Sequence, residues 1–251
     1  MAEQAQNGRY LYAVVPGPLE RTFDFAGLNG GPVYTVSNGR VAAVVSDVPE
    51  DRIRPERRHL AAQQAVLRGL MQGMPALLPM SFGIIATGPK DVKKILTRNQ
   101  AAFLKQLERV AGKIEMGLRV SWDVPNIFEY FVNSHPELEA SRDRLLSPQG
   151  NHSQGDMVEL GRLFDRLLQE DRELFTRQVE ETLALSCRKI KWNKCRQERE
   201  VMNLACLVAR QDEAAFEAAV FTAAKLFDNN FTFDYNGPWA PHNFVDLDLK
   251  F

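Results

Sequence analysis

The segment VYTVSNGRVAAVVS, residues 33–46, carries the clearest structural signal in the chain. Two runs rich in valine flank Asn38-Gly39, a dipeptide that is favoured between paired antiparallel strands. Asn and Gly both tolerate positive φ, which a two-residue type I′ turn requires at its two central positions. The segment therefore predicts a β-hairpin closed by a type I′ turn at Asn38-Gly39.

Further strand patterns lie on both sides of this hairpin. The other strands predicted in the N-terminal half are RYLYAVV (9–15), ALLPMSFGII (76–85) and IEMGLRVSWDV (114–124). We expect the second of them to bend at Pro79 and Gly83, because proline and glycine interrupt a regular strand. In the third, alternate residues should share one face of a sheet. These residues are Ile114, Met116, Leu118 and Val120.

Two helices are predicted between these strands. The first runs from Pro55 to about Met71, and the second begins near Pro89, a residue suited to the first helical position. The apolar residues expected on one side of the first helix are Leu60, Leu67, Leu70 and Met71. The resulting order is close to a ferredoxin-like α+β sandwich, in which helices cover one face of a sheet. We predict a modified sandwich of this kind as an N-terminal domain of residues 1–124.

The second half predicts another α+β domain, residues 125–251, with long helices and a small antiparallel sheet. The predicted helices cover 126–146, with a break near His135-Pro136, then 157–185 and 212–228. The predicted strands cover 188–193, 200–209 and 231–237, and SPQGNHSQGD (147–156) is expected to be a loop. The fold class is therefore α+β with two domains.

The composition is that of an ordinary globular protein. The chain has 251 residues, 45% hydrophobic and 25% charged, and a formal net charge of −1, which gives no general attraction to nucleic acid or anionic membranes. No apolar run approaches the ~20 residues of a membrane helix, and the start resembles no signal peptide. Three cysteines with spacing unlike a zinc site indicate reduced thiols in a cytoplasmic protein.

The sequence contains no pattern typical of an enzyme. The four histidines, at 59, 135, 152 and 242, are scattered, and no nucleotide-binding loop or nucleophile elbow is present. We therefore predict no catalytic, cofactor-binding or metal-binding residues, and no cofactor.

Two basic clusters leave three interpretations open. They are DRIRPERRH (51–59) and CRKIKWNKCRQER (187–199), the second centred on Trp192. They could form an RNA-binding surface on a ferredoxin-like sheet, although the RNP1 pattern is absent. They could dock an acidic protein partner. A solvated hairpin, with Ile190 and Trp192 packed inward, is the interpretation that we favour for the second cluster.

Several segments together resemble a known family. LLPMSFG (77–83), EMGLRV (115–120) and GPWAPHNFV (237–245), with the early RYLYAVV, are similar in order and spacing to the gas vesicle protein F/L family, and more to its F-type members. The resemblance covers essentially the whole chain. Ser81, Ala240 and His242 depart from residues that are common in the family, so no role is assigned to them.

The resemblance implies an accessory protein that binds the small hydrophobic shell protein of gas vesicles and assists nucleation or assembly. It implies no enzymatic activity, and a cytoplasmic protein associated with the vesicle. Other accessory proteins are further candidate partners, whereas nucleic acid and membranes are not. A partner of this kind could cover an apolar shell surface or add a strand to an exposed sheet edge.

We expect the binding surface on the N-terminal sheet and its edges. The residues predicted there are Tyr10, Tyr12, Asn38, Gly39, Arg52 and Arg54. The C-terminal segment YNGPWAPHNFV (235–245) should leave regular structure at its prolines. Its stiff, apolar residues either form a clasp that seals a core or anchor a partner. These residues are Pro238, Trp239, Pro241 and Phe244.

Overall fold

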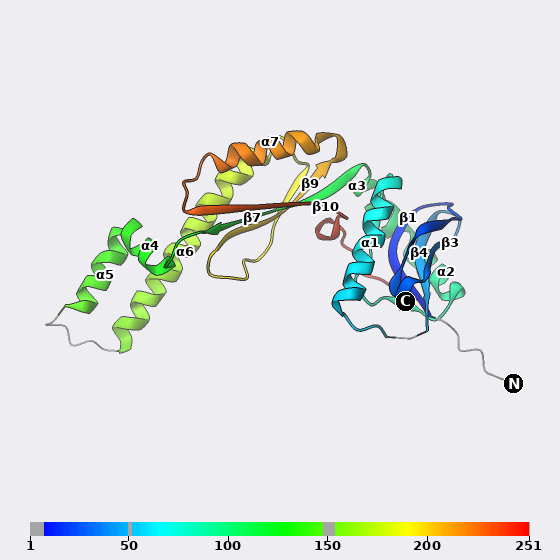
Figure 1. Ribbon diagram of the computed structural model, residues 1–251, viewed down its shortest axis with the longest axis horizontal. Coiled ribbons are helices and arrows are strands. Elements are labelled where there is room, and N and C mark those ends of the chain that lie inside the picture. Colours follow the sequence, from blue (N-terminus) through cyan, green and yellow to red (C-terminus); the bar gives the residue numbers. More distant parts are fainter. Residues whose placement is uncertain (1–7, 50–51, 148–153, 251) are drawn as a thin grey trace. The chain divides into compact units, whose positions relative to one another are not determined.

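A computed structural model describes residues 8–49, 52–147 and 154–250 (Figure 1). It confirms the α+β class, with antiparallel sheets and long helices. The contacts divide the chain into two compact units. Unit 1 holds Met1–Glu115 and Pro238–Phe251, and unit 2 holds Met116–Gly237. These bounds differ from the predicted 1–124 and 125–251, because most of the strand after residue 112 pairs in unit 2 and the C-terminal tail returns to unit 1.

Unit 1 is built on a six-stranded sheet with the order β2-β3-β4-β1-β5, in which β6 also pairs with β1. Its strands are β1 (Gly8–Pro16), β2 (Thr22–Ala26), β3 (Pro32–Ser37), β4 (Val41–Val48), β5 (Leu78–Pro79) and β6 (Ile85–Ala86). The predicted strand over 76–85 is thus two short pieces, separated by a turn in which Gly83 has a φ of 88°. β2 lies at one edge of the sheet.

The predicted hairpin is confirmed as β3 and β4, with Ser37 opposite Ala42. Its turn differs from the predicted type I′. Among the described residues of the turn only Gly39 has positive φ, at 92°, whereas type I′ requires two such residues. Glycine alone at the first central position fits type II′. The Asn38 side chain accepts hydrogen bonds from the backbone N–H groups of Arg40 (3.1 Å) and Val41 (3.0 Å), which explains its place before the turn.

The helices of unit 1 cover both faces of its sheet, not one face as predicted. They are η1 (Leu28–Gly30), α1 (Arg57–Gly73), α2 (Pro89–Arg98) and α3 (Gln100–Val110). On one face, Gln63 of α1 bonds to Tyr10 of β1, and Phe25 of β2 packs against Gly69. On the other face, Phe103 of α3 joins a buried cluster with apolar residues of β1, β3 and β4. Both faces of the central strands β1 and β4 are therefore largely buried.

The prediction that Leu60 of α1 is buried is wrong. Leu67, Leu70 and Met71 are buried as expected, but Leu60 is 42% exposed. Leu60 belongs to the first turn of α1, in which His59 is the buried residue.

Unit 2 contains a four-stranded sheet with the order β10-β7-β9-β8. Its elements are β7 (Lys113–Trp122), α4 (Ile127–Ser134), α5 (Pro136–Leu146), α6 (Gln154–Leu183), β8 (Lys189–Trp192), β9 (Glu200–Ala209), η2 (Arg210–Asp212), α7 (Glu213–Ala224) and β10 (Phe231–Trp239). The break at His135-Pro136 is confirmed. Residues 148–153 of the predicted loop lie outside the described residues. The strand predicted to complete the N-terminal sheet is β7, which instead pairs between β10 and β9.

Aromatic rings fill much of the core of unit 2. The Trp122 ring lies 5.3 Å from that of Phe131, which in turn lies 5.4 Å from Phe164 of α6 (ring centroids). The long α6 carries the predicted apolar stripe, but Met157 and Leu174 in that stripe are more than half exposed.

β10 continues through Pro238 to Trp239, although we expected regular structure to stop there. Proline lacks the N–H group that a sheet ladder needs, but β10 is an edge strand, where one side needs no donor. A 3-10 helix, η3 (His242–Phe244), follows in unit 1.

Candidate functional site

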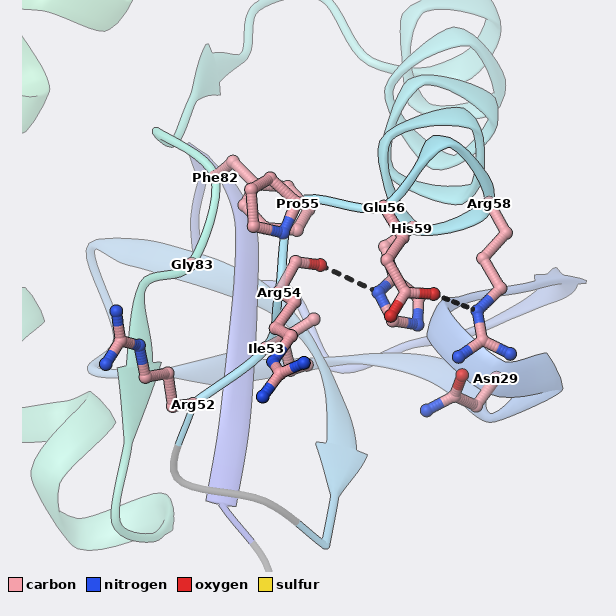
Figure 2. A pocket seen from close by; sticks show the side chains of 10 residues that line it. All are labelled: Asn29, Arg52, Ile53, Arg54, Pro55, Glu56, Arg58, His59, Phe82 and Gly83. Atoms are coloured by element: carbon pink, nitrogen blue, oxygen red, sulfur yellow. Dashed lines mark hydrogen bonds and ion pairs between the residues drawn. The ribbon is translucent and has the colours of Figure 1, made fainter.

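A cavity of unit 1 lies at the start of α1. Its volume is about 950 Å³, and Figure 2 shows the side chains that surround it. It is lined by Asn29, Arg52, Ile53, Arg54, Pro55, Glu56, Arg58, His59, Phe82 and Gly83. The predicted binding residues Arg52 and Arg54 thus lie together at one cavity, with a third arginine.

The cavity carries a net positive charge. Three arginines line it, and its single carboxylate, Glu56, forms an ion pair with Arg58 at 2.8 Å. All three arginines are exposed, so water screens this pair and it contributes little to stability. The first turn of α1 contains no acidic residue, and its cap residue Glu56 makes no side-chain capping bond. The positive end of the helix dipole therefore adds to the positive charge of the arginines.

His59 is the only histidine among the lining residues, and it is 7% exposed. Its Nδ1 donates a hydrogen bond to the backbone carbonyl of Arg54 at 2.9 Å. This direction is fixed because a carbonyl can only accept. The Nε2 atom is also buried and has no hydrogen-bond partner among the described residues. The ring thus holds the segment before α1 in place with one nitrogen, and the other is buried without a partner among the described residues.

Tyr10 and Tyr12 do not belong to an accessible surface, contrary to our prediction. Both side chains are fully buried. The Tyr10 hydroxyl donates to Gln63 at 2.7 Å and accepts from the Gly83 N–H at 3.2 Å, and burial raises its pKa to about 12. The Tyr12 hydroxyl lies 2.6 Å from that of Ser46, and burial raises its pKa. They hold the core together, and we remove them from the proposed binding surface.

Asn38 and Gly39 lie at the exposed end of the hairpin, away from the lining of the cavity. Asn38 donates from its side chain to Gln100 of α3 at 3.2 Å, so the turn is tied to a helix of the same unit. The two residues can be reached by a partner, but they are not part of the arginine-lined cavity.

The C-terminal tail packs onto unit 1 through Phe244, which is 2% exposed. Asn243 donates to the buried carboxylate of Glu115 from its backbone (2.7 Å) and its side chain (2.6 Å). Further along, Val245, Leu247 and Leu249 pack against the core cluster of unit 1. Pro241 is buried, Pro238 is exposed and Trp239 is half-buried. The clasp interpretation therefore suits Phe244 and Pro241 better than it suits Pro238.

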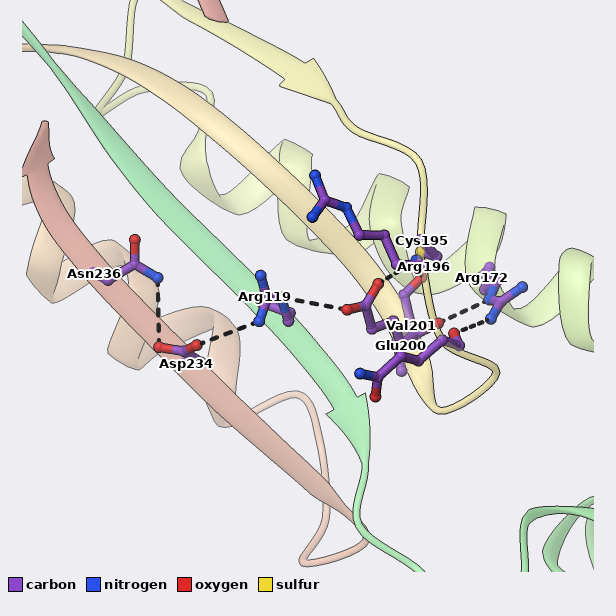
Figure 3. Close-up of polar contacts among 9 residues, drawn as sticks. Arg119, Arg172, Cys195, Arg196, Glu200, Val201, Asp234 and Asn236 are labelled. Carbon is purple, nitrogen blue, oxygen red and sulfur yellow. Dashed lines mark hydrogen bonds and ion pairs between the residues drawn. The ribbon is translucent and has the colours of Figure 1, made fainter. Parts of the chain in front are cut away.

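The sheet of unit 2 presents a polar face around Arg119. This side chain alternates with the buried Leu118 and Val120 and so points to the opposite face. Figure 3 shows Arg119 between Glu200, at 3.5 Å, and Asp234, at 3.9 Å. The arrangement is an ion-pair row across three neighbouring strands, in which the Asp234 side chain is 60% exposed and the Glu200 side chain is buried.

The loop of the second basic cluster is held by one arginine of α6. The Arg172 guanidinium donates to the backbone carbonyls of Gln197 (3.1 Å), Glu198 (2.8 Å) and Glu200 (2.8 Å), as Figure 3 shows in part. Trp192 was expected to pack inward but is 42% exposed, and its indole N–H donates to Glu180 at 3.2 Å. The cluster is a tethered hairpin with a solvent-facing aromatic residue.

No group of three or more His, Cys, Asp or Glu side chains within 8–49, 52–147 and 154–250 is placed to hold a metal ion. Asp171 lies 3.5 Å from His135, and burial raises the pKa of its carboxyl group. This pair joins the start of α5 to α6 in unit 2 and does not line the arginine-lined cavity. In the same part of the chain, every helix is too short or too polar to cross a bilayer.

Sequence reasoning missed the three cavity residues that lie outside the basic cluster 51–59: Asn29, Phe82 and Gly83. They come from η1 and the turn between β5 and β6, so only the folded chain brings them to the cluster. Asn29 did offer a signal, because it precedes two glycines. Its φ of 53° is unusual for a residue other than glycine, and asparagine is among those that tolerate such values.

The fold is shared with known structures. The crystal structure of the gas vesicle protein GvpF from an Anabaena strain matches with a TM-score of 0.85 at 23% identity, covering 96% of this chain and 99% of that one. The GvpF structure from Microcystis aeruginosa matches with a TM-score of 0.81 at 20% identity, with the same coverage.

Relatives by sequence bear similar names. Gas vesicle protein F of a Nostoc strain is 25% identical over 244 residues, which cover 96% of this chain and 99% of the relative. Gas vesicle protein F2 of Halobacterium salinarum is 26% identical over 245 residues, covering 96% and 93%. The family model described as "Gas vesicle synthesis protein GvpL/GvpF" matches residues 8–246. The chain therefore belongs to the GvpL/GvpF family of gas vesicle proteins.

Proposed function

We propose that this protein binds the hydrophobic shell protein of gas vesicles and assists vesicle nucleation or assembly. It works in the cytoplasm, at the vesicle, and makes or breaks no covalent bonds in doing so. The family supports a gas vesicle role, and it is not a known enzyme family. A subunit with an exposed apolar surface or an unpaired strand aggregates unless a partner covers it before assembly.

The observation that carries the proposal is the edge of the sheet in unit 1. Helices cover both faces of this sheet, so a partner can pair with it only at an edge. At the β5 and β6 edge the strands are two-residue pieces, whereas β2 is a five-residue strand. A strand added to β2 would gain main-chain hydrogen bonds from both chains.

The side chains of β2 suit this use. Phe23 is buried and stacks on Phe25 with ring centroids 5.0 Å apart, which fixes the strand on the unit. Thr22, Asp24 and Ala26 are exposed along it. Phe23 thus anchors the strand in the core while alternate residues stay accessible, and an anchored strand loses less entropy when a partner pairs with it.

A matched pair of lysine substitutions tests the role of β2. Charged residues on an edge strand discourage further pairing, so Ala26→Lys should weaken capture of purified shell protein by about tenfold or more. Ala218→Lys, at an exposed position of α7 in unit 2, adds the same charge away from β2 and should leave capture unchanged. Equal capture by both variants and the unmodified protein would remove β2 from the proposal. Failure of the unmodified protein to capture shell protein would contradict the proposed function itself.

A further inference from the structure

We propose that the arginine-lined cavity at the start of α1 binds a phosphate group, either as free phosphate or as part of a phosphorylated small molecule. This inference concerns a small ligand and does not depend on shell-protein binding at β2. The cavity residues lie on η1, the segment 52–56, α1 and the turn before β6, all within unit 1.

The charge of the cavity favours an anion of more than one negative charge. Arg52, Arg54 and Arg58 contribute three positive charges, and Glu56 removes one. The cavity also lies at the N-terminus of a 17-residue helix with no acid in its first turn. Backbone N–H groups at such a terminus and the helix dipole both favour a bound anion.

His59 is the observation that points to a ligand and not merely to a basic surface. Its ring is more than nine-tenths buried and lines the cavity, and Nε2 has no hydrogen-bond partner among the described residues. Figure 2 shows the ring between Arg54 and Arg58, with Nε2 turned toward the side where Arg58 and Asn29 lie. Because a buried polar atom without a hydrogen-bond partner is unfavourable, a ligand that bonds to Nε2 would remove that cost.

The directions of the donors favour a tetrahedral anion over a planar carboxylate. A carboxylate takes two parallel bonds from one guanidinium, whereas here Arg54, Arg58 and the Asn29 amide come from three separate elements (Figure 2). Four phosphate oxygens can accept from donors in several directions at once. Nε2 can accept from a protonated phosphate oxygen when the imidazole is neutral, or donate to an ionised one when it is charged.

The cavity is large enough for either free phosphate or a phosphorylated small molecule. A volume of about 950 Å³ exceeds a single phosphate ion and accommodates a phosphate monoester. Parallel titrations with inorganic phosphate and with ATP, at constant ionic strength, distinguish the two sources. If inorganic phosphate and ATP bind with equal affinity, free phosphate is sufficient as the ligand. If ATP binds more tightly, the ligand is a phosphorylated small molecule.

The test uses the full chain and glutamine variants of exposed arginines. Arg54→Gln and Arg58→Gln should each weaken phosphate binding by about tenfold, since each removes a charge-assisted hydrogen bond. Arg57→Gln is the matched control, because Arg57 is exposed on the same turn of α1 but does not line the cavity. Calorimetric titration measures the affinities, and circular dichroism checks that each variant is folded.

A second measurement detects ligand binding at His59 by NMR. It keeps His59 in place, because its Nδ1 donates a hydrogen bond to the Arg54 carbonyl. On saturation with phosphate, the ¹⁵N resonance of His59 Nε2 should shift, and it should not shift with chloride. The proposal is overturned if phosphate does not saturate, if Arg57→Gln weakens binding as much as Arg54→Gln, or if the His59 resonance stays unchanged at saturation.

Discussion

The sheets of the two units differ in how their faces are covered. The six-stranded sheet of unit 1 has α1 on one face and α2 and α3 on the other, so its central strands β1 and β4 are buried on both faces. The four-stranded sheet of unit 2 carries a polar row around Arg119 on one face. A sheet that is covered on both faces can interact with a partner only through its edges and the cavities around it, whereas a polar face tolerates water.

This difference predicts which substitutions should change stability and which should change binding. In unit 1, substitutions on the sheet faces should cost stability, and those at the β2 edge or in the arginine-lined cavity should change binding alone. In unit 2, substitutions on the polar face should cost little of either. The following predictions test this contrast, from the largest expected effect to the smallest.

The largest loss of stability is expected when Phe103 in the core of unit 1 is replaced. Phe103 is fully buried, and Phe103→Ala should lower the free energy of unfolding by about 3–5 kcal/mol through lost burial and the cavity left behind. Phe221→Ala is the control, since Phe221 is 64% exposed on α7, and it should change stability by less than about 0.5 kcal/mol. Urea unfolding measures both. A small effect at Phe103 would contradict the two-sided core.

Alkaline pH tests the burial of Tyr10. Its pKa is raised to about 12, whereas an unfolded tyrosine ionises near 10. The native state therefore holds its proton more tightly, and the associated stability is complete below about pH 10 and is lost as pH rises toward 12. The loss from this group should be about 2–3 kcal/mol. Tyr10→Phe should show a smaller loss of stability over this range than the unmodified protein, and an equal loss would contradict the burial.

The tail clasp is tested at Asn243. Asn243→Ala removes the side-chain bond to the buried Glu115 carboxylate and should cost about 1–3 kcal/mol, the usual penalty for an unsatisfied buried group. Asn229→Ala, at an exposed position outside the tail, is the control. Hydrogen exchange of residues 243–249 should rise in the Asn243 variant. Unchanged exchange there would show that the other contacts of the tail, its backbone bond to Glu115 included, hold it without this side-chain bond.

The smallest effect is expected on the polar face of unit 2. Arg119→Ala breaks ion pairs to Glu200 and Asp234, but its side chain is 46% exposed and its partner Asp234 is 60% exposed. Water screens such pairs, so the change should lie within about 1 kcal/mol. Thermal unfolding in low and high salt measures it. A larger loss would show that Arg119 shields the otherwise buried Glu200 more strongly than its own exposure indicates.

Local signals in the sequence predicted the elements well. The Asn38-Gly39 hairpin, the break before Pro136 and the helix starting at Pro89 follow from the conformational limits of a few residues, so they could be read directly. The sheet to which each strand belongs could not be predicted in this way. Residues 114–120 alternate correctly for a strand, but nothing local states which partners β7 pairs with.

The candidate site was predicted only in part, for a similar reason. Arg52 and Arg54 form a local cluster that is visible in the sequence, while Asn29 and Phe82 reach the same cavity through long-range folding. Tyr10 was misplaced because a strand pattern does not reveal whether one face or both faces of its sheet are covered. Pro238 was expected to end regular structure, and only the sheet order shows that its strand is an edge that accepts proline.

The most direct test of the central claim is site-specific photo-crosslinking while vesicles grow. A photoreactive residue replaces Asp24 on β2, and the control places it at Asp165, an exposed position of α6. Covalent adducts with the shell protein from position 24, and few from position 165, are the predicted result. Vesicle growth without shell-protein adducts at position 24 would contradict an account in which this protein acts by pairing its β2 edge with the shell subunit.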